Sequence, residues 1–287
     1  MLLGWYPSQS NPLASMLVER IPPLLRWAGG KRQLLSRLME FVPQDFHSGS
    51  YREPFLGAGC LFFALQPKKA VLSDANAYLI SCYEHVRDDW SAVNRCLRLH
   101  AQRTSEDHYY KTRTLYNKSQ HSASQAARFI YLNKACFNGI FRVNTKGEFN
   151  VPYGWKEPPA LPTAEVLERA SKALTHAVLV SHGFDEALEG AKRNDFVYLD
   201  PPYPPLNGTA YFTHYTMDRF TQSDQERLSS VVRYLDQVGC RVLMTSADIP
   251  LIRRLYKGFH IRSLPVTRFI TCKAVRHVVR EVVITNY

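Results

Sequence analysis

Three features that define common protein classes are missing from this 287-residue sequence. No apolar run approaches the roughly 20 residues needed to span a bilayer, and the N-terminus lacks the basic-then-apolar order of a signal peptide. The six cysteines include no Cys-x-x-Cys pair, so neither a zinc site nor a disulfide framework is indicated and free buried thiols are expected. We therefore expect a soluble, cytoplasmic protein that uses no metal.

Acidic residues are scarce in two parts of the chain. Residues 249–280 contain 8 Lys or Arg and no Asp or Glu, and residues 91–174 contain 13 against 6. The whole chain carries a formal net charge of +11. Tyr, Phe, His and Asn are interleaved with these cations, which is typical of surfaces that bind nucleic acid. A solvated basic face is the alternative interpretation, and charge alone does not decide between the two.

Short apolar segments alternate with helical stretches, which predicts an α/β fold with a parallel sheet and functional residues at the carboxyl ends of its strands. Strands are predicted over residues 51–55, 70–73, 177–180, 196–199, 241–244 and 278–285. A helix is expected between Thr221 and Val238, capped by Thr221 with Asp224 and stopped by Gly239. Residues 1–20 have the composition of a tail. Residues 91–174 predict a helical insertion followed by a hairpin or loop.

The most informative tetrapeptide follows the strand at 196–199 and runs Asp200-Pro201-Pro202-Tyr203. Consecutive prolines fix φ and remove backbone donors, so the Asp200 carboxylate and the Pro201 carbonyl form an acceptor-only cup. An exocyclic amino group offers two donors to such a cup, and Tyr203 supplies a ring on which a base can stack. A simple turn after a buried strand would have the same sequence, so the tetrapeptide alone leaves both interpretations open.

A glycine turn, Gly57-Ala58-Gly59, follows the first predicted strand and lets the backbone approach a ligand closely. Asp74 follows the second strand, where an acidic residue commonly accepts hydrogen bonds from ribose hydroxyls. A plain strand-to-helix turn and a helix N-cap at Asp74 are the alternatives. The run from Arg26 to Lys31 is glycine-rich but does not satisfy the phosphate-loop pattern.

These motifs, in this order, resemble the Dam-type (alpha-group) adenine-N6 DNA methyltransferases over residues 22–287. The anchors are residues 26–31, 53–59 and 200–203 and a central run from Phe137 to Gly154. The resemblance implies a Rossmann-like, S-adenosylmethionine-dependent methyltransferase fold with a mixed seven-stranded sheet. The catalytic domain would span 21–90 and 175–287, and a mainly helical target-recognition domain with a β-hairpin loop would span 91–174.

The resemblance also implies roles for individual residues. The catalytic set is Asp200, Pro201, Pro202 and Tyr203. The S-adenosylmethionine site comprises Trp27, Lys31, Phe55, Gly57, Gly59, Asp74, Phe184, Asp185 and Asp200. The DNA contacts comprise Arg26, Phe137, Asn138, Arg142, Asn150, Pro152 and Tyr153. Arg26 stands where relatives can carry Lys, and either a bidentate guanine contact, worth about 1–3 kcal/mol of discrimination, or a surface cation is consistent with it.

The expected reaction is methyl transfer to adenine N6 in double-stranded DNA after base flipping, with GATC as the expected site because the central run matches members that read it. A monomer is expected, active without any cognate restriction endonuclease. Transfer to cytosine N4 or to RNA adenine is a rival, since the acceptor cup fits any exocyclic amine. A catalytically inactive DNA-binding relative is a rival of another class.

Overall fold

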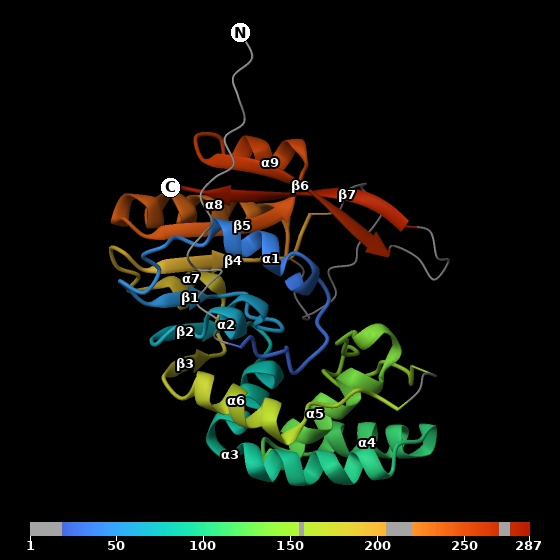
Figure 1. Ribbon diagram of the computed structural model, residues 1–287. Helices are drawn as coiled ribbons and strands as arrows, with labels where there is room; N and C mark the ends of the chain where they lie inside the picture. Colours follow the sequence, from blue (N-terminus) through green and yellow to red (C-terminus); the bar gives the residue numbers. More distant parts are fainter. Residues whose placement is uncertain (1–18, 155–157, 205–219, 270–275) are drawn as a thin grey trace.

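A seven-stranded mixed sheet forms the centre of the molecule (Figure 1). The computed structural model describes residues 19–154, 158–204, 220–269 and 276–287. The strand order is β3-β2-β1-β4-β5-β7-β6, with β7 antiparallel to both of its neighbours and the remaining pairs parallel. The strands are β1 Tyr51–Glu53, β2 Ala70–Ser73, β3 Ala177–Val180, β4 Phe196–Leu199, β5 Arg241–Ala247, β6 His260–Phe269 and β7 Arg276–Thr285.

Strand β4 lies at the middle of the sheet and is buried along its whole length. Its alternate residues serve two separate cores: Phe196 and Tyr198 join one, and Val197 and Leu199 join the other. Such a strand is continuously apolar because both faces of the sheet are covered. This packing fixes the direction in which β4 delivers the residue that follows it, Asp200.

Helices cover both faces of the sheet (Figure 1). They are α1 Leu35–Leu38, α2 Cys60–Leu65, α3 Ala77–Gln102, α4 Glu106–Lys118, α5 Ala123–Ala135, α6 Ala164–Leu174, α7 Phe184–Leu188, α8 Gln222–Val238 and α9 Pro250–Leu255, with short 3-10 turns at Lys31–Gln33, Met39–Phe41 and Phe137–Gly139. Helix α8 begins at a capping box, in which the side chains of Thr221 and Asp224 each accept a hydrogen bond from the backbone nitrogen of the other. It ends at Gly239, which has φ 88°. The prediction for this helix is confirmed.

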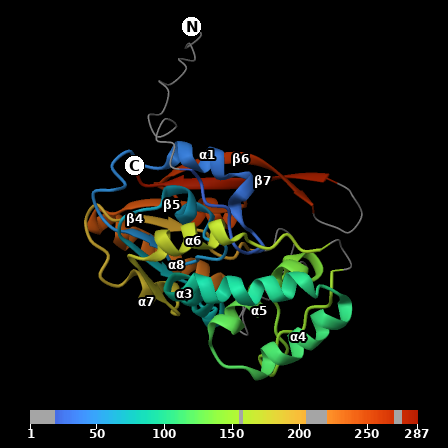
Figure 2. The same cartoon turned by 60° about the horizontal axis from the view of Figure 1, so that its bottom comes forward.

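Helix α3 connects the sheet to the inserted segment. Its N-cap is Asn76, just beyond β2, and its backbone breaks from helical geometry at Asp89 (φ −150°, ψ 66°) before continuing to Gln102. Helices α4 and α5 lie beyond it, to one side of the sheet in both views (Figures 1 and 2). Helix α6 packs on α3 and returns the chain to β3.

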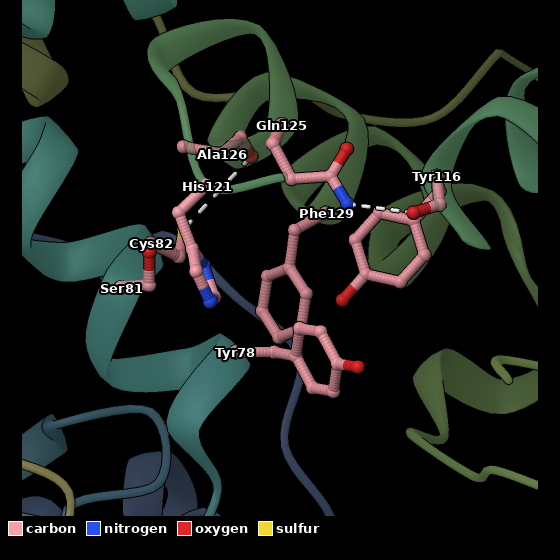
Figure 3. Close-up of a pocket in the computed structure, with 8 residues that line it drawn as sticks. All are labelled: Tyr78, Ser81, Cys82, Tyr116, His121, Gln125, Ala126 and Phe129. Atoms are coloured by element: carbon pink, nitrogen blue, oxygen red, sulfur yellow. Dashed lines mark hydrogen bonds between the residues drawn. The ribbon is translucent and has the colours of Figure 1, made fainter. Parts of the chain in front are cut away.

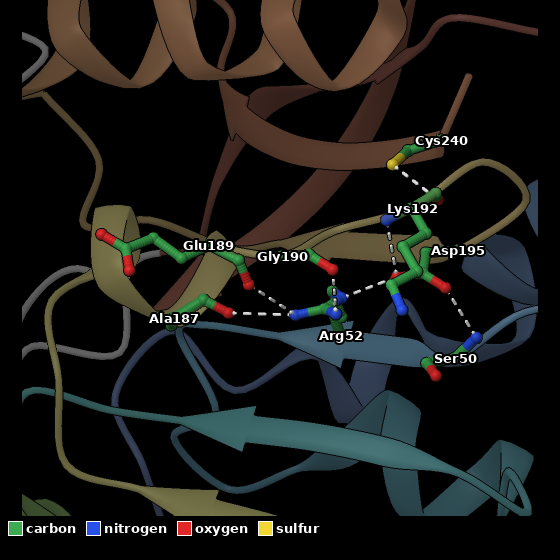
Figure 4. A network of polar contacts seen from close by, with 8 residues as sticks. All are labelled: Ser50, Arg52, Ala187, Glu189, Gly190, Lys192, Asp195 and Cys240. Carbon is green, nitrogen blue, oxygen red and sulfur yellow. Dashed lines mark hydrogen bonds and ion pairs between the residues drawn. The ribbon is translucent and has the colours of Figure 1, made fainter. Parts of the chain in front are cut away.

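A buried ion pair fixes the sheet at the end opposite to the predicted site (Figure 4). Arg52 of β1 donates from Nε to Asp195 Oδ2 at 2.8 Å, and its other nitrogens bond the carbonyls at the end of α7, including that of Gly190 at 3.0 Å. Asp195 also accepts from the backbone nitrogens of Ser50 and Lys192. The pair therefore joins β1, β4 and the helix that carries Phe184.

Most strand predictions are confirmed, with four differences. Strand β1 ends at Glu53 instead of residue 55, β5 is longer than expected, β7 begins at Arg276 instead of residue 278, and β6 was not predicted. Cys60, Cys82, Cys136 and Cys240 are free and buried as expected, whereas Cys96 is only half-buried. Cys272 and tail residues 1–18 lie outside the described residues. Within the described parts of the chain, no helix is long and apolar enough to cross a membrane.

Candidate active site

The glycine turn and Asp74 meet at the carboxyl edge of β1 and β2. Asp74 Oδ2 accepts from the backbone nitrogen of Gly57 at 3.0 Å, and Oδ1 accepts from that of Asn76 at 2.9 Å. Asp74 is therefore not the N-cap of α3, since Asn76 has that position. Burial raises the pKa of Asp74 to about 6, against the opposing effect of these two backbone donors. Each of its oxygens keeps one lone pair for a further donor.

The side chain of Trp27 packs against the glycine turn. Gly57 and Gly59 both have positive φ, 47° and 61°, where a side chain would strain the backbone. A Cβ at Gly57 would also lie 2.7 Å from Cδ1 of Trp27. The indole in turn stacks on Phe141 of the inserted segment, with ring centroids 5.8 Å apart. The predicted cofactor loop and the insertion are thus in direct contact through one aromatic side chain.

The Asp200 carboxylate is fixed from two directions. Lys31 Nζ lies 2.7 Å from Oδ2, and the hydroxyl of Thr245 donates to Oδ1 at 2.7 Å. Burial raises the pKa of Asp200, while the ammonium and the hydroxyl act in the opposite direction. Lys31, predicted for the cofactor site, therefore also touches the predicted catalytic tetrapeptide. One lone pair of each carboxylate oxygen is still available to accept from an amino group.

Two residues of the tetrapeptide are held by side chains of other elements. Gln225 of α8 donates to the carbonyl of Pro202 at 2.9 Å, and the Tyr203 hydroxyl donates to Glu281 Oε2 on β7 at 2.9 Å. Lys31 Nζ lies 4.8 Å from the centroid of the Tyr203 ring, within cation–π range. The half-buried ring is thus restrained at its hydroxyl and over one face.

A further buried acid, Glu53, is the last residue of β1 and lies close enough to Asp200 and Asp74 to be affected by their charges. It accepts a hydrogen bond from the Tyr51 hydroxyl at 2.7 Å and is 2% exposed. Burial raises its pKa to about 8, with the negative charges of Asp200 and Asp74 adding to the increase and the Tyr51 hydroxyl opposing it. Glu53 is therefore mainly protonated at neutral pH.

Sequence reasoning missed Thr245, Gln225, Glu53 and Glu281. The signal for Glu281 was a single acid inside the β-branched run that closes the chain, which was interpreted only as a strand. A carboxylate within an otherwise buried strand is rare unless it is paired. Thr245 and Gln225 gave no comparable signal, because a threonine in a strand and a glutamine in a helix are common.

Phe55 and Phe184 come together as predicted. Their rings stack with centroids 5.6 Å apart, and Phe220 packs edge-on against Phe55 at 5.8 Å. The neighbouring carboxylate, Asp185, is paired with Arg227 of α8 at 3.0 Å. An aromatic wall with one acid beside it can bind a purine, provided that Arg227 leaves an oxygen of Asp185 available.

The predicted DNA contacts gather on the loop between α5 and α6. A hairpin is formed by a bridge between Val143 and Phe149, which confirms the expectation for this run. The backbone nitrogen of Phe137 donates to the carbonyl of Pro152 at 3.0 Å, and Arg142 Nε donates to Asn150 Oδ1 at 2.8 Å. Of the six members of the predicted set that lie on this loop, four have exposed side chains, those of Phe137, Asn138, Arg142 and Pro152; Asn150 and Tyr153 are half-buried.

Arg26 joins this loop although it is more than a hundred residues away. Asn133 of α5 bonds both backbone groups of Arg26, each at 2.7 Å. Gly139 packs so closely on the Arg26 side chain that a Cβ there would lie 2.5 Å from Arg26 Cβ. The exposed Arg26 therefore lies beside the turn at Phe137 and Asn138, as a shared DNA surface requires.

A small pocket lies elsewhere, between the start of α3 and helices α4 and α5 (Figure 3). Tyr78, Tyr116 and Phe129 supply its aromatic side chains, and Gln125 donates to the carbonyl of Tyr116 at 2.7 Å. Its lining includes none of the predicted site residues. The chemistry-bearing side chains are instead gathered at the carboxyl edge of the sheet.

Comparison with known proteins agrees with this geometry. Residues 27–270 match the family described as D12 class N6 adenine-specific DNA methyltransferase. Two type II methyltransferases are each 37% identical to the chain: M1.LlaDCHI of Lactococcus lactis subsp. cremoris, over 92% of this chain and 95% of its own, and M.MjaIII of Methanocaldococcus jannaschii, over 93% and 99%. The DNA adenine methylase of Escherichia coli K12 is 35% identical over 86% and 88%. The chain therefore belongs to the D12 class of N6 adenine-specific DNA methyltransferases.

Proposed function

We propose that the chain transfers a methyl group from S-adenosylmethionine to N6 of an adenine turned out of duplex DNA, at the edge formed by β4 and β5. The observation that carries this proposal is the Asp200 carboxylate, fixed by Lys31 and Thr245 next to the Tyr203 ring. Turning a base out costs a few kcal/mol, and stacking on an aromatic ring returns about 1–3 kcal/mol.

The edge formed by β1 and β2 fits the cofactor. Gly57 and Gly59 give a backbone cradle that a Cβ at Gly57 would fill, and Asp74 offers its remaining lone pairs to ribose hydroxyls. The stacked rings of Phe55 and Phe184 suit the adenine of the cofactor. When bound, S-adenosylmethionine supplies a methyl group on a positively charged sulfur.

The protein's contribution to the reaction is mainly positioning. Asp200 accepts hydrogen bonds from the exocyclic amino group, together with the Pro201 carbonyl, and holds the N6 lone pair toward the methyl group. In this transfer the bond between N6 and the methyl carbon would form as the carbon–sulfur bond breaks and S-adenosylhomocysteine leaves. The nearby carboxylate would stabilise the positive charge on N6, without having to reorganise, until N6 loses a proton to solvent. Lys31 and Thr245 keep the carboxylate in place, so the reacting atoms are aligned before the reaction begins.

Target recognition is assigned to the exposed loop of the insertion together with Arg26. The loop's backbone is closed by its own hydrogen bonds, while Phe137, Asn138 and Arg142 project outward. Arg side chains read guanine in the major groove through bidentate contacts. GATC is proposed as the target sequence because this loop, in its sequence, resembles family members that read GATC.

Two measurements test the proposal. The first is single-turnover methylation by Asp200→Ala, which should be lost by about a thousandfold or more while cofactor affinity is largely unchanged, because an electrostatic acceptor has been removed. Asp107→Ala is the matched control, since Asp107 is exposed on α4 and, within the described parts of the chain, forms an ion pair with its helical neighbour Lys111 alone. A fully active Asp200→Ala enzyme would refute the mechanism.

The second measurement maps methylated bases in plasmid DNA from a Dam-deficient host that expresses the protein. N6-methyladenine confined to GATC is expected. Methylation of adenine in another sequence would refute the target but leave the mechanism, so the two parts of the proposal fail separately.

A further inference from the structure

The last strand of the sheet brings a carboxylate to the catalytic edge. Because β7 runs antiparallel to β5, its second half pairs with β5, and Glu281, the first residue of that half, lies opposite Ala247 at the carboxyl end of β5. Cross-strand partners project from the same face, and so do residues two apart in one strand. The side chains of Glu281 and Thr245 therefore share a face of the sheet, next to Asp200.

Glu281 is buried, with an exposed fraction of 4%, and the next three residues of β7, Val282 to Ile284, are buried and apolar. Burying a carboxylate is costly unless it is paired, so its position has to be explained by the groups that it meets. It accepts from the Tyr203 hydroxyl at 2.9 Å, and among the described residues the charged groups of Asp200 and Lys31 lie close to this edge. The adjacent Arg280 is exposed and projects from the opposite face.

Tyr203 needs such a restraint more than an ordinary buried tyrosine does. Its backbone is restricted on one side by Pro202, whose carbonyl is bonded by Gln225. Its ring can still rotate about two side-chain bonds, and a hydrogen bond at the hydroxyl opposes that rotation at the far end of the ring, in addition to Lys31 over one face. A hydrogen bond from that hydroxyl to a residue of a rigid strand fixes the plane of the ring.

We propose that Glu281 is a positioning residue for methyl transfer: by accepting the hydrogen bond of the Tyr203 hydroxyl, it holds the ring in the plane on which the target adenine stacks. The inference rests on the proposed role of Tyr203. Glu281 acts through Tyr203 and does not touch the reacting atoms. Its contribution as a positioning residue therefore depends on the hydroxyl and on an acceptor at position 281.

The test is a double-mutant cycle on the full chain, read as the single-turnover rate at saturating cofactor and DNA. Tyr203→Phe keeps the ring and removes the hydroxyl, and Glu281→Leu removes the acceptor. Each should slow the reaction about tenfold, which is about 1.4 kcal/mol and the size of one hydrogen bond. The double variant should be no slower than Tyr203→Phe alone, because both changes remove the same interaction.

Glu281→Gln is the matched variant, because it keeps an oxygen acceptor and removes the charge. It should stay within about threefold of the wild-type rate, a difference of under about 0.7 kcal/mol. Additive losses in the double variant, or a Gln variant as slow as the Leu variant, would overturn the inference. So would a wild-type rate for Tyr203→Phe, which decides the question even if Glu281→Leu does not fold.

Asp200→Ala, measured in the same series, separates this inference from the proposed function. If Asp200→Ala is inactive and the cycle is additive, only the role of Glu281 fails. If Asp200→Ala is active, the proposed mechanism fails whatever the cycle gives. Cofactor affinity should stay within about twofold of the wild-type value in the Tyr203 and Glu281 variants, under about 0.5 kcal/mol, because neither residue belongs to the cofactor edge.

Discussion

The catalytic edge and the recognition loop are fixed in opposite ways. At the catalytic edge, side chains hold side chains: Lys31 and Thr245 fix Asp200, and Glu281 fixes Tyr203. In the loop, residues 136–154, most of the bonds hold the backbone, such as that from the Tyr109 hydroxyl to the carbonyl of Val151 at 2.8 Å, and the exposed Arg142 is bonded only within the loop, to Asn150, among the described residues.

This difference matches what each region has to do. A group that aligns reacting atoms loses rate when its geometry loosens by a fraction of an ångström, so its side chain must be fixed before the substrate arrives. A side chain proposed to read bases, such as that of Arg142, would meet DNA only on binding, and a fixed loop with exposed side chains is sufficient for that. We therefore expect substitutions at the catalytic edge to change the rate and substitutions in the loop to change the choice of DNA.

Lys31→Met should give the largest effect among the following variants, a loss of about a hundredfold in the single-turnover rate at neutral pH. Removing the ammonium leaves the Asp200 carboxylate buried without its cation, which raises its pKa further. An acid with a higher pKa is ionised only at higher pH, so the variant should recover activity as pH rises. A rate that stays low at every pH would show that Lys31 does more than keep Asp200 ionised.

Gly57→Ala at the cofactor edge can be compared with Gly147→Ala in the recognition loop. Both glycines have positive φ, 47° and 78°, but a Cβ at Gly57 would meet Trp27 whereas one at Gly147 has no atom within 4 Å. The strain is common to both and costs about 1 kcal/mol of stability. Calorimetry should find a further loss of roughly thirtyfold in cofactor affinity, about 2 kcal/mol, for Gly57→Ala alone. Equal affinities in the two variants would remove the cradle from the cofactor site.

Acidification should weaken cofactor binding through Asp74. Its pKa is raised to about 6, so the carboxyl group is protonated below that pH and ionised above it. Ribose hydroxyls donate to the ionised form, so affinity should be about tenfold weaker at about pH 5 than at about pH 8. Asp74→Asn should bind weakly with little pH dependence. An unchanged slope in that variant would assign the titration to another group.

Arg142→Gln should have the smallest effect on the methylation rate. With saturating DNA that contains the preferred site, the rate should stay within about threefold of the wild-type value, a difference of under about 0.7 kcal/mol. Its expected consequence is a loss of discrimination between preferred and altered sites of about 1–3 kcal/mol, as for one guanine contact. Competition between two DNA duplexes, followed by sequencing of the methylated products, measures this. Lys146→Gln is the control, because Lys146 is an exposed cation of the same hairpin. Equal discrimination in both variants would argue against base reading by Arg142.

The sequence predicted what depends on local patterns. Strands β2, β3 and β4 and helix α8 agree with their apolar runs and caps, and the tetrapeptide follows β4 as expected. The contacts of Asp200 with Thr245 and of Tyr203 with Glu281 could not be predicted, because they depend on the register of β4 against β5 and of β5 against β7. Strand β6 was missed because Pro265 interrupts its pattern, and a proline is tolerated there since β6 is at the edge of the sheet.

The catalytic contacts also determine when the protein can become active during folding. Lys31 and Asp200 are 169 positions apart, and Tyr203 and Glu281 are 78 apart. Closing such long loops is entropically costly, so contacts of this kind generally form after local helices and turns. A partly folded chain with its helices in place would still lack the fixed acceptor for the amino group. Enzyme activity is therefore a stricter report of complete folding than helical content, and a recovery of circular dichroism ahead of methylation should be visible during refolding.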